Sequence, residues 1–229
     1  MPPGSPRSRC WLRPCGWWRS GVRTWLADRL RDFLYGLIVA LVTPVIWALF
    51  RLRVRGWRNL RGTGILVARH RSYWDIPVLC VAAGPWNRIG FLARRGLLKN
   101  PIFAPLVWGF ATVIDRDAFG LKDFRKALRA AKRNRLIGIF PEGTTRPGAK
   151  PKPGAIRFAE LLDRPLIPAN LVPRGPYPPN YPLGFPRMEV RFGPPVSVGE
   201  LAQGLPPDLP RGERYRLLTE RLMERIDAV

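Results

Sequence analysis

The sequence is poor in the residues that build metal sites and disulfide frameworks. Its 229 residues include one histidine and three cysteines, Cys10, Cys15 and Cys80, and they contain no C-x-x-C pair. An odd number of cysteines beside a single histidine argues against a structural zinc site or a disulfide scaffold. The composition therefore predicts an intracellular chain without a bound metal.

Acidic residues are also scarce. The chain has 39 Lys/Arg against 16 Asp/Glu, a formal net charge of +23. Residues 191–229 carry six of each sign, so the whole excess lies in residues 1–190. A field of this sign favours an anionic partner, which is nucleic acid, an anionic membrane surface or an acidic protein. A GC-rich genome would explain the preference for arginine over lysine, but it does not explain the shortage of acids.

The N-terminal part of the chain contains a basic segment and an apolar one. Residues 1–23 mix arginine with tryptophan, a composition that suits a bilayer interface or a disordered basic tail. Residues 33–50 run for eighteen residues without a charge, the short end of what spans a bilayer. Arginines flank this run on both sides, whereas a single span usually shows a bias to one side. We therefore expect residues 24–53 to form a membrane-associated helix, kinked at Pro44, or a helical hairpin in one leaflet; a true span and a buried core helix are the alternatives.

Short apolar runs alternate with helical stretches from Arg61 onward. Residues 121–133 place their apolar side chains on one helical face, and residues 212–227 resemble an amphipathic closing helix. This alternation predicts an α/β fold with a mostly parallel sheet flanked by helices. A proline-rich loop is expected at residues 173–186. The expected strands are residues 64–68, 89–93, 111–114, 136–140, 166–172 and 188–192.

His70 and Asp75 form the first constellation that could carry chemistry. His70 directly follows a predicted strand, and α/β proteins place their chemistry in loops at strand ends. Residues five apart in an unbroken helix point about 140° away from each other, so the two side chains meet only if the chain turns between them. Ser72 could supply that turn as the N-cap of a helix that starts at Tyr73. The alternative is a plain capping box beside a surface histidine.

A His–Asp pair has a clear chemical use. The carboxylate holds the imidazole in one tautomer and stabilises the imidazolium, while the other ring nitrogen takes a proton from a hydroxyl. The sequence has no G-x-S-x-G nucleophile elbow. The simplest scheme is therefore an acceptor alcohol that attacks an acyl thioester directly.

A second constellation, FPEGTTR at residues 140–146, follows another predicted strand. A glycine permits close backbone approach to a ligand, threonine hydroxyls donate hydrogen bonds, and an arginine binds phosphate with two parallel bonds. Turns after strands often contain proline and glycine for purely structural reasons, which is the alternative for this block alone. Its candidate ligand-binding residues are Gly143, Thr144, Thr145 and Arg146.

A third block, GFATVIDR at residues 109–116, ends a predicted strand in Asp115 and Arg116. In isolation these two residues would be interpreted as an ordinary surface ion pair. The three blocks in one chain are much more specific than any one of them.

The order and spacing of the blocks resemble the glycerolipid acyltransferase family, which includes bacterial 1-acylglycerol-3-phosphate acyltransferase. That family has an H-x-x-x-x-D block, a G-x-x-F-I-D-R-like block, an F-P-E-G-T-R-S-like block and a short apolar stretch around a proline. The corresponding segments here are HRSYWD, GFATVIDR, FPEGTTR and LIPANLV, and the resemblance covers residues 54–195.

The resemblance implies roles for individual residues. His70 would be the general base and Asp75 the residue that orients it. A basic residue often follows F-x-A in the family, and Arg94 stands at that place here. The residues expected to hold the acceptor's phosphate or headgroup are Arg94, Arg116, Glu142, Gly143, Thr144, Thr145 and Arg146.

The same resemblance implies a reaction and its partners. A fatty acyl group would pass from acyl-CoA or acyl carrier protein to the free hydroxyl of 1-acyl-sn-glycerol 3-phosphate, giving phosphatidic acid for phospholipid biosynthesis without a cofactor. The partners would be membrane phospholipid, lysolipid and the acyl donor, with no nucleic acid. The enzyme would lie on the cell inner membrane or cytoplasmic membrane with its active site facing the cytoplasm. The chain would have three parts. These are a basic tail at residues 1–23, a membrane-associated helical segment at residues 24–53 and an acyltransferase domain at residues 54–229.

One departure from the family pattern concerns the acceptor. Thr145 occupies the place where the family usually has arginine, and Arg146 follows one position late. Resembling E-G-T-T variants occur among members that acylate other lysolipids, so another lysolipid is the alternative acceptor. Lys150, Lys152 and Arg157 lie close by and could compensate. Two further alternatives are a basic nucleic-acid-binding module, supported by net charge alone, and a scaffold with an inactive acyltransferase fold.

Overall fold

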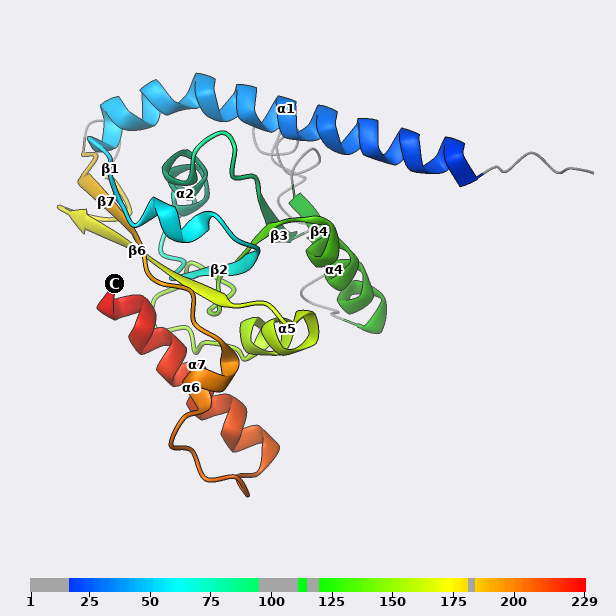
Figure 1. The fold of residues 1–229 in the computed structure, drawn as a ribbon. Coiled ribbons are helices and arrows are strands. Elements are labelled where there is room, and N and C mark those ends of the chain that lie inside the picture. The colour runs from blue at the N-terminus through cyan, green and yellow to red at the C-terminus, as the bar shows by residue number, and fades with distance from the viewer. Residues whose placement is uncertain (1–16, 95–110, 115–119, 181–183) are drawn as a thin grey trace, which may run out of the picture.

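A computed structural model of the protein describes residues 17–94, 111–114, 120–180 and 184–229 (Figure 1). A seven-stranded sheet lies at its centre, with the order β1-β7-β6-β2-β5-β3-β4. Neighbouring strands are parallel except for β6 and β7, which are antiparallel. The predicted α/β fold with a mostly parallel sheet is therefore confirmed. The strands are β1 Arg53–Arg55, β2 Gly64–Ala68, β3 Ile89–Arg94, β4 Ala111–Ile114, β5 Leu136–Ile139, β6 Leu166–Arg174 and β7 Arg187–Phe192.

The central strand β2 shows why the apolar runs are strands. All its residues are buried. Ile65 and Val67 pack into the core on one face of the sheet, and Leu66 and Ala68 pack into the core on the other. A parallel strand covered on both faces is apolar throughout, which explains the continuous run. β1 is a strand that the sequence does not predict, because three residues are too few for a periodic signal.

The antiparallel pair β6 and β7 extends further than expected. Its ladder continues to Arg174, which pairs with Arg187. The loop predicted at residues 173–186 therefore begins only at Gly175. Cross-strand pairing with β7, which no local pattern reveals, holds the end of β6 in the sheet.

Helices cover both faces of the sheet (Figure 1). α1 and α2 share one hydrophobic core with the strands, and α4, α5, α6 and α7 share the other. The predicted helices at residues 121–133 and 212–227 are confirmed as α4 and α7. The helices are α1 Trp17–Phe50, α2 Asp75–Ala83, α4 Leu121–Arg133, α5 Gly154–Leu162, α6 Val198–Ala202 and α7 Arg211–Ala228, with a 3₁₀ turn, η1, at Trp57–Leu60.

α1 is one continuous helix that runs along the outside of the domain (Figure 1). It begins at Trp17, inside the segment expected to be a tail. The expected helical hairpin is wrong, because the helix continues through Pro44. A proline inside a helix costs about 3 kcal/mol. Val39 before it and Ile46 and Phe50 after it are all buried in one core, and about 1.5–3 kcal/mol for each buried side chain offsets that cost.

Candidate active site

His70 and Asp75 come together at the end of β2. His70 follows the strand, and Asp75 is the first residue of α2, so a tight turn separates them. Nδ1 of His70 lies 3.0 Å from Oδ2 of Asp75. The Asp75 side chain is only 1% exposed. The expectation that the chain turns to join the two residues is confirmed.

The turn is built differently from the expected N-cap. α2 begins at Asp75 rather than at Tyr73. Ser72 is not its N-cap, because Trp74 holds that position without a side-chain cap hydrogen bond. The backbone N–H groups of Arg71 and Ser72 instead donate to Oδ2 of Asp75, at 2.7 and 2.9 Å. The carboxylate itself closes the turn, since a charged acceptor binds N–H groups more strongly than a hydroxyl does.

Tyr177 completes the surroundings of Asp75. It lies in the loop between β6 and β7, and its hydroxyl donates to Oδ1 of Asp75 at 2.5 Å. Burial, together with the negative charge of Asp75, raises the pKa of the Tyr177 phenol well above its ordinary value, so it stays protonated as a donor. Both oxygens of the buried carboxylate therefore have hydrogen-bond partners, as a buried charge requires.

The imidazole of His70 is held in a defined plane. It stacks on Phe140, with ring centroids 4.2 Å apart, and Phe140 stacks in turn on Phe91. A carboxylate accepts hydrogen bonds and does not donate them, so the neutral ring carries its proton on Nδ1, facing Asp75. The lone pair on Nε2 then has no partner among the described residues. This is the arrangement that a general base needs.

Glu142 joins the second constellation to the first. Its Oε2 accepts the backbone N–H of His70 at 2.7 Å, and its Oε1 accepts from Arg69 at 3.0 Å. Arg69 also donates to both carboxylate oxygens of Asp227 on α7, at 2.6 and 2.5 Å. The hydrogen bonds from Arg69 lower the pKa of the Asp227 carboxyl below its ordinary value. A chain of ion pairs thus runs from the C-terminal helix to the backbone of His70.

The remaining residues of the FPEGTTR block form a turn after β5. Gly143 has a φ of 65°, in the left-handed region that glycine adopts without strain. Its N–H donates to the carbonyl of Phe140 at 3.0 Å. The Thr144 hydroxyl accepts the N–H of Arg146 at 3.3 Å. Thr145 is half-buried and Arg146 is exposed, so the arginine can reach a ligand from the surface.

The other predicted site residues are only partly located. Arg94 is the last residue of β3, which is parallel to β5, so it lies at the same edge of the sheet as the turn after β5. Arg116 lies outside the described residues. Within the described ranges, no group of three or more His, Cys, Asp or Glu side chains is placed to hold a metal ion.

Three residues at the site are not among those that the sequence predicts. Tyr177 lies in a proline-rich loop and Asp227 near the end of α7, where no motif marks them. Arg69 lies beside His70 but has no distinguishing spacing. Only the proximity of Arg69 to the histidine could have indicated a role from the sequence.

The chain is similar to known proteins over most of its length. Residues 51–172 match the model of a family described as Acyltransferase. The chain is 28% identical over 167 residues to the 1-acyl-sn-glycerol-3-phosphate acyltransferase of Bacillus subtilis (strain 168), covering 72% of this chain and 80% of that protein. It is also 28% identical over 190 residues to the protein of the same name from Streptococcus pneumoniae (strain ATCC BAA-255 / R6), covering 80% of this chain and 69% of that protein.

A solved structure has the same fold. The 1-acyl-sn-glycerophosphate (LPA) acyltransferase PlsC from Thermotoga maritima superposes with a TM-score of 0.61. The match covers 92% of this chain and 88% of that one, at 18% sequence identity. This likeness establishes the fold, including an α/β sheet flanked by helices.

Proposed function

The chain belongs to the Acyltransferase family, and on that premise we propose that it transfers a fatty acyl group to the free hydroxyl of 1-acyl-sn-glycerol 3-phosphate, giving phosphatidic acid. The names of the two relatives support this acceptor. The observation that carries the proposal is the contact between His70 Nδ1 and Asp75 Oδ2. That contact directs the Nε2 lone pair away from Asp75, where it can take the acceptor's proton.

The proposed reaction uses the two ring nitrogens of His70 in turn. Nε2 takes the hydroxyl proton while the hydroxyl oxygen bonds the thioester carbonyl carbon. The imidazolium formed is stabilised by Asp75 through Nδ1. The carbon–sulfur bond then breaks, and the departing thiolate takes the proton back from Nε2. The donor is a thioester on coenzyme A or on acyl carrier protein, and N–H or hydroxyl groups near the site would stabilise the oxyanion between these steps.

The turn after β5 is the proposed place for the acceptor's phosphate. Thr144 and Thr145 offer hydroxyls there, and Arg146 offers an exposed guanidinium. Arg94, at the end of β3, is proposed to contribute as well, and so is Arg116, on the strength of the family resemblance. Glu142 belongs to the same block, but its two oxygens already accept from His70 and Arg69. We assign it to positioning His70.

α1 supports attachment to a membrane. Among the described residues it holds the one stretch long and apolar enough to cross a bilayer, Asp28–Phe50. One face of the helix packs on the domain, so we propose that it lies in the interface of the cytoplasmic membrane rather than crossing it, with the site on the cytoplasmic side. Large apolar side chains on its outer face are exposed at Leu26, Leu30, Phe33, Leu34, Leu37, Leu41, Val45 and Trp47.

The test is acyl transfer by the purified protein with a panel of lysolipids and two donors, acyl-CoA and acyl-acyl carrier protein. We expect the highest kcat/KM with 1-acyl-sn-glycerol 3-phosphate. Acylation of a different lysolipid without formation of phosphatidic acid would refute 1-acyl-sn-glycerol 3-phosphate as the acceptor. It would leave the proposed role of His70 as general base intact. Absence of transfer to every lysolipid by a folded protein would refute both.

A further inference from the structure

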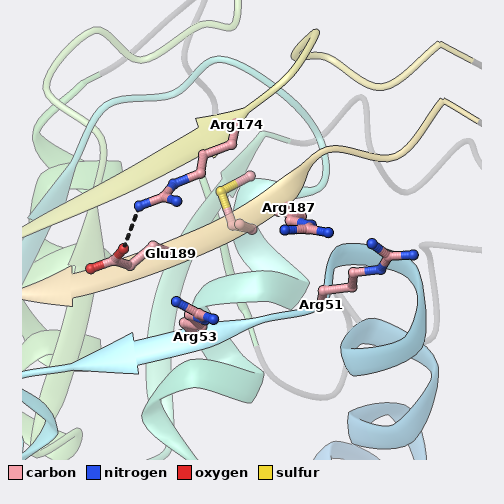
Figure 2. A pocket seen from close by; sticks show the side chains of 6 residues that line it. Arg51, Arg53, Arg174, Arg187 and Glu189 are labelled. Carbon is pink, nitrogen blue, oxygen red and sulfur yellow. Dashed lines mark ion pairs between the residues drawn. The ribbon is translucent and has the colours of Figure 1, made fainter.

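An arginine pocket lies where α1 joins the sheet, outside the site described above (Figure 2). It is a hollow of about 280 Å³. Its residues come from the α1–β1 turn where it enters β1, from β6 and from β7, so three separate chain segments converge there. The residues that line the arginine pocket are Arg51, Arg53, Arg174, Arg187, Met188 and Glu189.

Sheet pairing sets two of these positive charges directly opposite each other. Arg174 on β6 is the direct antiparallel partner of Arg187 on β7. Arg53 on β1, by contrast, pairs with Glu189, a residue of opposite charge. Like charges directly opposite each other in a sheet are destabilising. The fold therefore maintains a repulsive arrangement at this place, and a bound anion would relieve it.

The single carboxylate of the pocket does not neutralise it. Glu189 accepts from Arg55 at 2.8 Å and from Arg191 at 2.9 Å, both outside the pocket lining. The hydrogen bond from Arg191 lowers the pKa of Glu189, which keeps it ionised. Arg174 approaches it only at 3.9 Å. Among the described residues, Arg51, Arg53 and Arg187 have no carboxylate within ion-pair distance.

The surface around the arginine pocket suits contact with lipid rather than with another protein. An open groove next to it is lined by Trp47, Leu52 and Val54 together with three arginines. Trp47 is 53% exposed and stands at the end of the exposed apolar face of α1. Tryptophan beside arginine is the combination found where a protein surface meets lipid headgroups.

The pocket also lies at the same edge of the sheet as His70. Ala68, just before the histidine, pairs with Ala169 on β6. β6 continues in the same direction from there to Arg174, roughly 16 Å further at about 3.3 Å per residue. A single membrane surface along this edge could therefore meet both the pocket and the catalytic pair.

From these observations we infer that the arginine pocket binds the phosphate of an anionic bilayer phospholipid, distinct from the acceptor. The inference rests on the membrane association proposed above. The bound headgroup holds the domain with the His70 edge against the membrane, from which the lysolipid acceptor arrives. α1 supplies the apolar part of the attachment and the arginine pocket supplies the anion-selective part.

The backbone conformation of Arg51 allows a test that separates lipid binding from folding stability. Its φ of 43° lies in the left-handed region, at the position after the last residue of α1. Glycine is the usual residue there, because it adopts this conformation without strain. Arg51→Gly is therefore expected to keep or raise the melting temperature while it weakens binding to anionic vesicles. A purely structural role for Arg51 predicts no change in vesicle binding.

The main experiment is sedimentation of the full-length protein with vesicles. One set is phosphatidylcholine alone and the other is phosphatidylcholine with phosphatidylglycerol. The pocket variant is Arg51→Gln, Arg53→Gln and Arg187→Gln. Each arginine near an anionic surface contributes about fivefold to binding, so we expect about a hundredfold loss on the anionic vesicles and little change on the others.

The matched control removes the same charge from the opposite end of the sheet. It is Arg125→Gln, Arg129→Gln and Arg133→Gln, three exposed positions on α4. Binding of the control to the anionic vesicles should fall less than tenfold. Equal losses of binding in both variants would overturn the inference, because binding would then depend on the overall net charge and not on the pocket. Unchanged vesicle binding with lost transfer from acyl carrier protein would also overturn it. Activity of the pocket variant on detergent-dispersed lysolipid with acyl-CoA tests the proposed function separately.

Discussion

The Tyr177 hydroxyl and His70 Nδ1 contact different oxygens of the same buried carboxylate, that of Asp75. Tyr177 donates to Oδ1 at 2.5 Å, and His70 lies 3.0 Å from Oδ2. The tyrosine comes from the loop between β6 and β7, and the histidine comes from the end of β2. A carboxylate held from both sides cannot rotate without losing a hydrogen bond. Tyr177 therefore positions Asp75, which in turn positions the proposed base.

Tyr177→Phe tests this relationship. Loss of the hydroxyl leaves Oδ1 of Asp75 without a partner in a buried place, which costs about 1–3 kcal/mol of folding free energy. We expect kcat to fall about tenfold while KM for the acceptor stays near the wild-type value, since a tenfold change corresponds to about 1.4 kcal/mol. Urea denaturation and steady-state kinetics measure the two effects.

The matched control is Tyr215→Phe. Its hydroxyl donates to Glu160 at 2.5 Å, on the other face of the sheet. This variant should lose folding free energy without losing kcat. Equal kcat values for Tyr177→Phe and wild type would show that the Tyr177 contact has no part in the reaction.

Replacement of the pair itself should abolish most turnover. His70→Ala removes the proposed base, and we expect a loss of about 10³-fold in kcat. Asp75→Asn presents an amide N–H to Nδ1 and favours the wrong tautomer, so its loss should be of the same order. Circular dichroism verifies folding of both variants. Near-normal turnover by folded His70→Ala would show that His70 is not the general base.

Glu142 and Arg146 should affect different kinetic constants, although they stand in one sequence block. Glu142→Gln disturbs the contacts to His70 and Arg69, so kcat should fall about tenfold with little change in KM. The weakened hydrogen bonds correspond to a loss of about 1–2 kcal/mol of transition-state stabilisation. Arg146→Gln removes an exposed cation proposed to bind the acceptor's phosphate, so KM should rise about tenfold instead. Steady-state kinetics at varied lysolipid concentration separates the two. A rise in KM alone for Glu142→Gln would instead assign it to phosphate binding.

The Asp227 carboxylate makes the free energy of unfolding depend on pH in the acid range. Because Arg69 lowers the pKa of this carboxyl below its ordinary value of 3.8, the pair stabilises the fold above about pH 4. That contribution is lost as the pH falls through the lower folded-state pKa. Asp227→Asn should reduce the free energy of unfolding by about 0.5 kcal/mol at pH 7, a small value because the carboxylate is half exposed, and by less in acid.

Urea denaturation at a series of pH values checks this prediction. Asp208→Asn, an exposed position before α7, serves as the control and should leave the acid limb of the stability curve unchanged. A difference between Asp227→Asn and wild type that is constant down to pH 2 would contradict the ion pair with Arg69.

Much of the fold follows from patterns between near neighbours in the sequence. The bounds of α4 are those that its apolar spacing predicts, and β2 is the buried strand that its continuous apolar run predicts. The contact between His70 and Asp75 was also predictable, because only a turn separates the two residues. The helix start at Asp75 was not, because the expected N-cap, Ser72, gives its backbone N–H to that carboxylate.

The sequence by itself determined the α/β class, the main helices and strands, the His–Asp pair and the family to which the chain belongs. These depend on local periodicity and on short blocks of residues, which the order of amino acids contains directly. Only the tertiary structure decided that α1 is one helix through Pro44, that Tyr177 and Asp227 belong to the site, and that four arginines from three separate segments form a pocket. Those features depend on which strands become neighbours in the sheet. That choice is set by burial and pairing between residues far apart in the chain, and it leaves no periodic pattern in any one segment.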